Sequence, residues 1–236
     1  MHSSNHRRRW STRLIVFFFR RSKHRVIHHI KVAVFDHAKH IGTLDKVEAA
    51  LDLVLRHDPR ALQVLQTQTD GIFVFMTHGG AYAEWSRDGK LVLLKPEYVS
   101  APETSSLQLA SALVHEATHV WLEKLGFQYS PERRPRIEAI CFKRQLRFVK
   151  HAGGGSELVS ELERQLKREP QYFSDEAFRE RSLTELQTEL DRLGVPRRIV
   201  ITFEQWLKLW WWLTRRLKTD AERNAVGARR TSGRAH

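Results

Sequence analysis

Apolar residues recur every three or four positions over most of the chain, and this spacing predicts helices. In the segment 44–57 they line one face, with Thr43 as the expected cap and Asp58-Pro59 as the end. The same pattern predicts further helices from Ser105 or Ser106 to Gly126, from near Pro135 to the glycines 153–155, and over 156–168, 175–193 and 203–218. We therefore expect the C-terminal half of the chain to be helical.

Short runs of β-branched and aromatic residues between the first two of these helices predict strands. The runs cover 72–76, 81–85 and 91–94, and Asp88-Gly89 separates the last two. An Asp-Gly pair between two such runs is typical of a tight hairpin. We expect a small, mainly antiparallel sheet of two or three strands before the helix at 105–126, and hence a mostly helical α+β fold.

The formal charge of +13 is concentrated at the two ends of the chain. Residues 1–40 carry +9 and residues 197–236 carry +7, which leaves −3 for residues 41–196. This distribution predicts a basic N-terminal arm (1–40), a central domain (41–152), a helical region packed on it (153–220) and a disordered basic tail (221–236). The basic ends are suited to contact nucleic acid or an anionic membrane, whereas the slightly acidic centre is not.

The chain has one cysteine, Cys141, so no disulfide can form within it and a cluster of several thiolates is excluded. The longest early apolar run, Leu14 to Phe19, is too short for a membrane span or for the core of a signal peptide. We therefore expect a cytoplasmic protein. The arginines beside that run leave peripheral contact with an anionic membrane open.

The last predicted helix, 203–218, is rich in tryptophan and apolar nearly all round its axis. Helices of this kind are usually buried or docked on a partner. We expect this helix to pack in the core, with an oligomer contact or anchoring at a membrane interface as the alternatives.

The segment His115-Glu116-Ala117-Thr118-His119 lies inside the long helix that is predicted to end at Gly126. Positions i and i+4 of a helix share a face, so both imidazoles can bind one ion. Neutral imidazole is a good ligand for zinc, and Glu116 is placed to take a proton from a zinc-bound water. The sequence therefore predicts a zinc site with His115 and His119 as ligands and Glu116 as general base. The alternative is a helix whose histidines face solvent or fill the core.

A third zinc ligand has to come from another part of the chain. Glu123 lies about 12 Å along the helix axis from His115, too far to share an ion with it. Glu138 is the better candidate, because it lies on the next predicted helix among apolar neighbours, where an unpaired carboxylate would be costly. An ion pair between Glu138 and Arg134, or an exposed Glu138, is the alternative.

The histidine pair, followed after eighteen residues by Glu138, resembles the gluzincin class of zinc metallopeptidases. The wording HEATH followed by RIEAIC also resembles uncharacterised bacterial proteins described as metallopeptidases. The resemblance covers about residues 71–150 and implies a zincin-like catalytic domain with bound zinc and a peptide or protein substrate held by the edge strand of the sheet. One departure is Phe142, because several gluzincins have an acid at this place that orients a histidine. In this chain another residue must therefore orient the histidine.

The resemblance also implies a hydrogen-bond donor that faces the oxyanion of the transition state. Tyr129, in the predicted loop between the two zinc helices, is the first candidate, followed by Tyr98 and His151; packing or surface roles are the alternatives for all three. Together these features predict a zinc-dependent hydrolase, a peptidase in which Glu116 activates the water. The competing interpretation is a non-catalytic zincin-like protein that its basic ends recruit to nucleic acid or an anionic membrane.

Overall fold

The computed structural model describes residues 3–35, 42–75, 77, 81–127, 129–174, 176, 177, 180 and 184, with the backbone alone described for residues 3–11. Residues Arg13–Leu183 form one compact unit, to which the following paragraphs refer. The expected helix 203–218 with its tryptophans and the tail 221–236 lie outside the described residues, as does most of 175–193. Within the described segments, no helix has both the length and the apolar character to span a bilayer.

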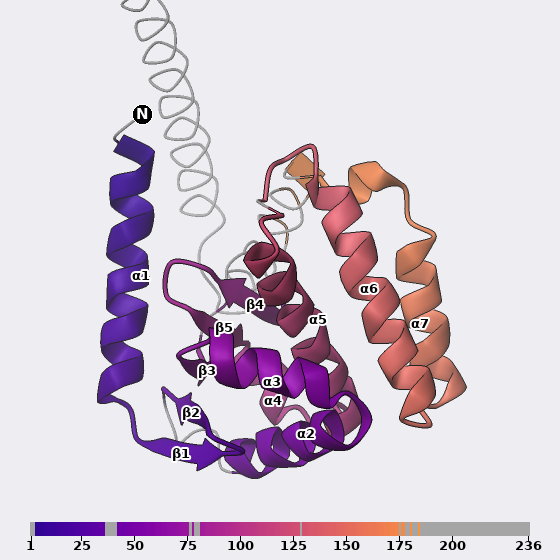
Figure 1. Ribbon diagram of the computed structural model, residues 1–236, viewed down its shortest axis with the longest axis horizontal. Coiled ribbons are helices and arrows are strands. Elements are labelled where there is room, and N and C mark those ends of the chain that lie inside the picture. The colour runs from indigo at the N-terminus through magenta and orange to yellow at the C-terminus, as the bar shows by residue number, and fades with distance from the viewer. Residues whose placement is uncertain are drawn as a thin grey trace, which may run out of the picture. The chain divides into compact units, whose positions relative to one another are not determined.

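A mixed sheet of five strands lies at the centre of the described part of this unit (Figure 1). The strands lie in the order β1-β2-β3-β5-β4 and comprise β1 (His24–Ile27), β2 (Ile30–Val34), β3 (Gly71–Val74), β4 (Ala83–Ser86) and β5 (Leu91–Leu94). β3 runs parallel to both β2 and β5, whereas β1–β2 and β4–β5 are antiparallel. The expected α+β fold and the hairpin around Asp88-Gly89 are confirmed. The expected mainly antiparallel sheet of two or three strands is wrong. The sheet has five strands, and β3 pairs in parallel with both β2 and β5 because β5 lies between β3 and β4.

The two additional strands, β1 and β2, lie in the segment that we expected to be a basic arm. They are joined by His28-His29, and both residues have positive φ angles, 47° and 63°. Hairpins usually obtain this backbone shape from Asn-Gly or Asp-Gly, so the usual turn residues are absent here. Later helices hold the turn instead: His28 Nε2 lies 2.6 Å from an Asp52 carboxylate oxygen, and the Gln66 amide donates to the His28 carbonyl at 2.8 Å.

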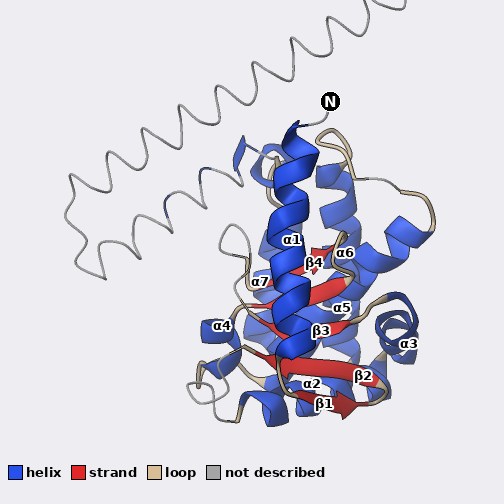
Figure 2. Cartoon of the chain, turned by 90° about the vertical axis from the view of Figure 1, so that its left-hand side faces the viewer, coloured by secondary structure: helices blue, strands red, loops and turns tan. Residues whose placement is uncertain are grey.

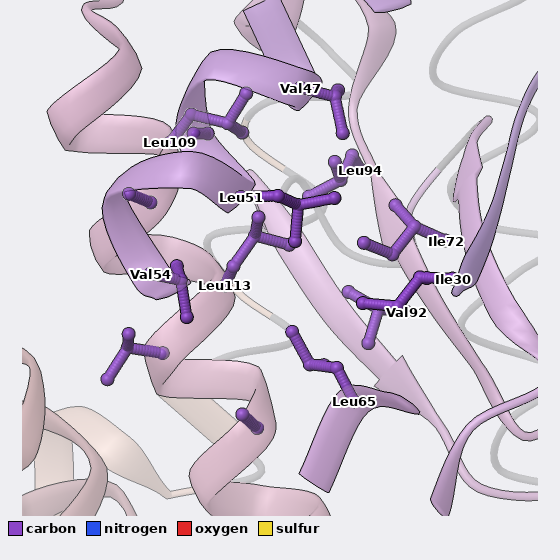
Figure 3. Close-up of a cluster of buried hydrophobic side chains, with 14 of the residues drawn as sticks. Ile30, Val47, Leu51, Val54, Leu65, Ile72, Val92, Leu94, Leu109 and Leu113 are labelled. Atoms are coloured by element: carbon purple, nitrogen blue, oxygen red, sulfur yellow. The ribbon is translucent and has the colours of Figure 1, made fainter. Parts of the chain in front are cut away.

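Helices cover both faces of the sheet, which explains why its central strands are apolar throughout (Figure 2). Alternate side chains of β3 and β5 belong to opposite layers. One layer joins Phe73, Leu91 and Leu93 to Ile15 and Phe19 of α1 (Ser3–Arg21). The other joins the strands to the helices on the opposite face of the sheet, and its largest side chains meet in one apolar cluster (Figure 3), among them Leu51, Leu65, Ile72, Val92, Leu94, Leu109 and Leu113.

Asp58 links three helices. It ends α2 (Thr43–His57) and caps α3 (Pro59–Gln68), where its side chain accepts a hydrogen bond from the Ala61 backbone N–H at 3.0 Å. The same carboxylate accepts hydrogen bonds from Arg144 of α6 (Arg134–His151) at 3.1–3.2 Å. The expected helix at 44–57 is thus confirmed, but Thr43 is not its cap. Thr43 is the first helical residue, and Gly42 precedes it in a left-handed conformation.

The remaining helices are α4 (Pro96–Ser100), α5 (Ser106–Lys124) and α7 (Ser156–Leu166), followed by a short 3-10 helix, Pro170–Phe173. α5 begins with a capping box, because the Ser105 hydroxyl accepts from the Gln108 N–H and the Gln108 side chain accepts from the Ser105 N–H. It ends before Gly126, whose φ of 83° favours glycine. The predicted helices at 105–126, 135–152 and 156–168 are therefore confirmed, whereas α1, α3 and α4 are additional.

Asp58→Ala should lower the free energy of unfolding by about 1–2 kcal/mol, because it removes a helix cap and the partner of Arg144 together. Urea unfolding followed by circular dichroism measures this difference. Asp45→Ala is a matched control, since the Asp45 side chain is 74% exposed and pairs with Arg25 at the surface, where ion pairs contribute little. Equal unfolding midpoints for the two variants would contradict the role of Asp58.

Candidate metal centre

His115 and His119 lie one turn apart on α5 and face α6, which runs beside α5 (Figure 1). Their Nε2 atoms are 3.2 Å apart, and their side chains are 11% and 16% exposed. The Phe142 ring of α6 packs edge-on against the His115 ring, with centroids 4.7 Å apart, and Phe173 packs on Phe142. The two imidazoles that were predicted to share an ion therefore converge at a place that water reaches only in part.

Glu138 of α6 faces both imidazoles. Its Oε2 atom lies 3.4 Å from His115 Nε2 and 3.7 Å from His119 Nε2. Its Oε1 atom lies 3.8 Å from Nε of Arg134, one turn earlier on the same helix. The two interpretations left open for Glu138, metal ligand and partner of Arg134, are thus compatible, because they use different oxygens.

Cys141 lies one turn after Glu138 on α6 and is fully buried. The histidines His115 and His119 and this cysteine each offer one ligand atom, and these three atoms lie within 4.8 Å of one another. Burial raises the pKa of the Cys141 thiol, and the neighbouring His119 opposes this rise. This group could hold a metal ion.

A chain of hydrogen bonds determines which nitrogen of His115 carries a proton. The Ser111 hydroxyl donates to the Gln108 carbonyl at 2.8 Å, so its oxygen accepts the 3.1 Å hydrogen bond from Gln145 Nε2. The Gln145 amide therefore turns its oxygen toward His115, 3.0 Å from Nδ1. Because an amide oxygen can only accept, Nδ1 carries a proton, and in the neutral imidazole Nε2 is the nitrogen whose lone pair faces His119 and Glu138.

The separations of three donor atoms are close to those around one tetrahedral ion. Ligand atoms at about 2.0–2.1 Å from zinc lie about 3.3–3.5 Å from one another. The Nε2 atoms of His115 and His119 and the Oε2 atom of Glu138 are 3.2, 3.4 and 3.7 Å apart. Adjustments of a few tenths of an ångström would let these three atoms bind one ion.

Burial couples the charges within this cluster. Burial lowers the pKa of His119, but Cys141 and Glu138 beside it raise that pKa well above its ordinary value. Burial raises the pKa of Glu138, whereas His119 and His115 hold it well below its ordinary value. A buried carboxylate thus keeps positive charge on the neighbouring imidazole, and a bound cation would supply the same compensation.

Glu116 is buried on α5 beside the metal-ligand candidates. Burial raises the pKa of Glu116; His119 and His115 oppose this rise, and Glu138 and Glu84 add to it. A carboxyl with a raised pKa accepts a proton more readily near neutral pH, as a general base must. Glu84 belongs to β4, the edge strand of the described sheet, and β4 contacts α5.

Among the candidate oxyanion donors, Tyr129 is the one that the structure connects to the centre. It lies in the loop between α5 and α6, is 45% exposed, and has its ring 5.6 Å from the guanidinium of Arg134, which faces the carboxylate of the centre. Tyr98 stacks on Tyr82 at 4.6 Å, and burial together with Tyr82 raises the pKa of Tyr98 to about 12. His151 is the last residue of α6, about 20 Å along the helix from the centre, so the structure does not bring it to the site.

Glu123 lies outside the centre, and its hydrogen bonds explain its position. Its carboxylate accepts from the indole N–H of Trp85 at 2.9 Å and from Nε of Arg87 at 2.6 Å. These bonds attach β4 and the turn after it to the last turn of α5. Glu123 therefore places the edge strand next to the helix of the centre.

Two residues of the centre, Cys141 and Gln145, were missed by the sequence analysis. Both share a face of α6 with Glu138, since they follow it by three and seven positions. This spacing was the available signal. Gln145 supplies the histidine support that Phe142 cannot, because an amide oxygen accepts the Nδ1–H proton of His115 as a carboxylate would.

Gln145→Leu should weaken the binding of a metal ion at this centre, with zinc as the probe, by about 10–100-fold, because Nδ1 of His115 loses the acceptor that fixes its tautomer and ring orientation. Competition with a chelator of known zinc affinity measures this change. Gln165→Leu is the matched control, since Gln165 of α7 donates to Glu161 outside the centre. The same affinity in both variants would contradict the role of the hydrogen-bond chain.

Comparison with known proteins found no relative of this chain. No family model, curated protein or solved structure matches the chain. The resemblance to gluzincins consequently stays a prediction from the residues that carry it. The interpretation of the centre rests on the geometry of its own side chains.

Proposed function

We propose that this chain is a zinc-dependent hydrolase whose metal is held by His115, His119 and Glu138. The observation that carries the proposal is the chain of hydrogen bonds ending at His115, which holds Nδ1 as a donor and directs Nε2, the metal-binding nitrogen of the neutral imidazole, at His119 and Glu138. A histidine that merely fills a core does not need a fixed tautomer pointing at a carboxylate and a second imidazole. Two imidazoles and one carboxylate form a donor set typical of catalytic zinc.

When bound, zinc would polarise a carbonyl and lower the pKa of a coordinated water. The side chains of the centre supply the remaining chemistry. Glu116 follows His115 directly on α5 and would accept a proton from that water and return it to the leaving group. Arg134 and Tyr129 lie on the same side of the centre as Glu138 and would supply positive charge and a hydroxyl donor next to the reacting carbonyl.

A peptide is the substrate that the surroundings of the centre favour. β4 is an edge strand in the described sheet, and Glu123 fixes it beside α5 through Trp85 and Arg87. An extended peptide can add to an edge strand by main-chain hydrogen bonds, which would carry its amide bonds past the centre. The resemblance to gluzincins, in which the edge strand binds substrate, supports the same class of reaction.

The metal ligands predict a definite pattern of zinc content. Wild-type protein should contain one zinc per chain, whereas His119→Ala and Glu138→Ala should bind it more weakly and contain less of it after purification, because each variant loses one of the donors that converge on the ion. Elemental analysis of the purified variants measures this directly. Full zinc content in Glu138→Ala would remove Glu138 from the ligand set.

Glu116→Gln should keep its zinc and lose peptide hydrolysis by a factor of about 10²–10⁴, the usual contribution of a general base. The measurement is hydrolysis of a fluorogenic peptide library together with zinc content. Glu157→Gln is the control, since Glu157 is an exposed carboxylate in the first turn of α7. Full hydrolysis by Glu116→Gln would refute its role, and zinc-loaded wild type without any hydrolysis would favour a non-catalytic binding protein.

A further inference from the structure

Cys141 is the part of the centre that a three-ligand site does not use. It lies on the same face of α6 as Glu138 and is buried with Leu122 and Ile137 in a small apolar cluster between α5 and α6. Its sulfur is nevertheless turned to the imidazoles, since its ligand atom lies within 4.8 Å of those of His115 and His119. A cysteine that only filled this cluster would have no need to face two metal-ligand candidates.

The distances are compatible with sulfur as a fourth ligand. In a tetrahedral site with Zn–N of about 2.05 Å and Zn–S of about 2.3 Å, nitrogen and sulfur lie about 3.6 Å apart. The separations of the Cys141 sulfur from the ligand atoms of His115 and His119 are at most 4.8 Å and so exceed this value by about 1.2 Å at most, a shift within reach of a small side-chain movement. Glu138 and the two imidazoles would take the other three positions, and their side chains are only 11–16% exposed.

We propose that the Cys141 thiolate occupies the fourth position of the metal in the resting protein and closes the centre. This proposal rests on the proposed function, because it needs the same ion. Catalytic zinc sites keep one position open for water, whereas sites with four protein ligands are closed. Hydrolysis by this chain therefore requires the metal–sulfur bond to break: the thiolate takes a proton from the solvent and departs as a neutral thiol, and it leaves the position to a water whose proton passes to Glu116.

Cobalt(II) tests the fourth ligand directly in the full-length protein. A cobalt–thiolate bond produces a charge-transfer absorption in the near ultraviolet, and Cys141 is the only cysteine of the chain, so such a band identifies its source. We expect wild type to bind one cobalt per chain and to show the band. Cys141→Ala should bind cobalt through the other three ligands without the band, and Ile140→Ala, which alters the same apolar cluster, should retain it.

The outcomes separate the two proposals. One cobalt per chain without a charge-transfer band would overturn the role of Cys141 and leave the three-ligand centre intact. Absence of bound cobalt would overturn the proposed function and this proposal together. Zinc-loaded Cys141→Ala should also hydrolyse peptide at least severalfold faster than wild type, because its fourth position is open from the start. Equal rates would overturn the closing role even if the band is present.

Discussion

The packing of α6 against α5 is the constraint on which the candidate centre depends. α5 supplies His115, His119 and Glu116, whereas α6 supplies Glu138, Cys141 and the support of His115. A slip of α6 by one residue would rotate its donor face away by about 100°. The register of the two helices therefore has to be fixed by contacts outside the centre, and the apolar cluster around Leu122 together with the bond between Asp58 and Arg144 provides them.

Charge is the second constraint. Two imidazoles, two carboxylates and a thiol lie at the contact between α5 and α6 with little exposure to water. Without a cation, this group has to keep a proton among its members to avoid uncompensated negative charge in a medium of low polarity. Burial of these groups therefore lowers the stability of the fold, and a bound cation would offset this loss.

Sequence analysis captured the features that depend on local pattern. The two long helices, their glycine ends and the β4–β5 hairpin follow from periodicity and turn residues. The β1–β2 hairpin could not be found in this way, because its turn is held by Asp52 and Gln66, which come from helices later in the chain. The parallel pairing of β3 with β5 likewise depends on contacts far apart in sequence. Within the site, the apolar neighbours of Glu138 in the sequence indicated a candidate ligand. The sequence around Cys141 is typical of a core residue, and only the packing of α6 against α5 brings its sulfur near the imidazoles.

Asp58 shows how narrow the choice of residue can become at a single position. Asparagine could cap α3 equally well, but it would lose the charge that holds Arg144. Glutamate would keep the charge, but its longer side chain caps helices poorly. Aspartate alone meets both demands among the natural amino acids, so the tolerance for substitution at the junction of α2 and α3 should be far lower than its place near the surface suggests.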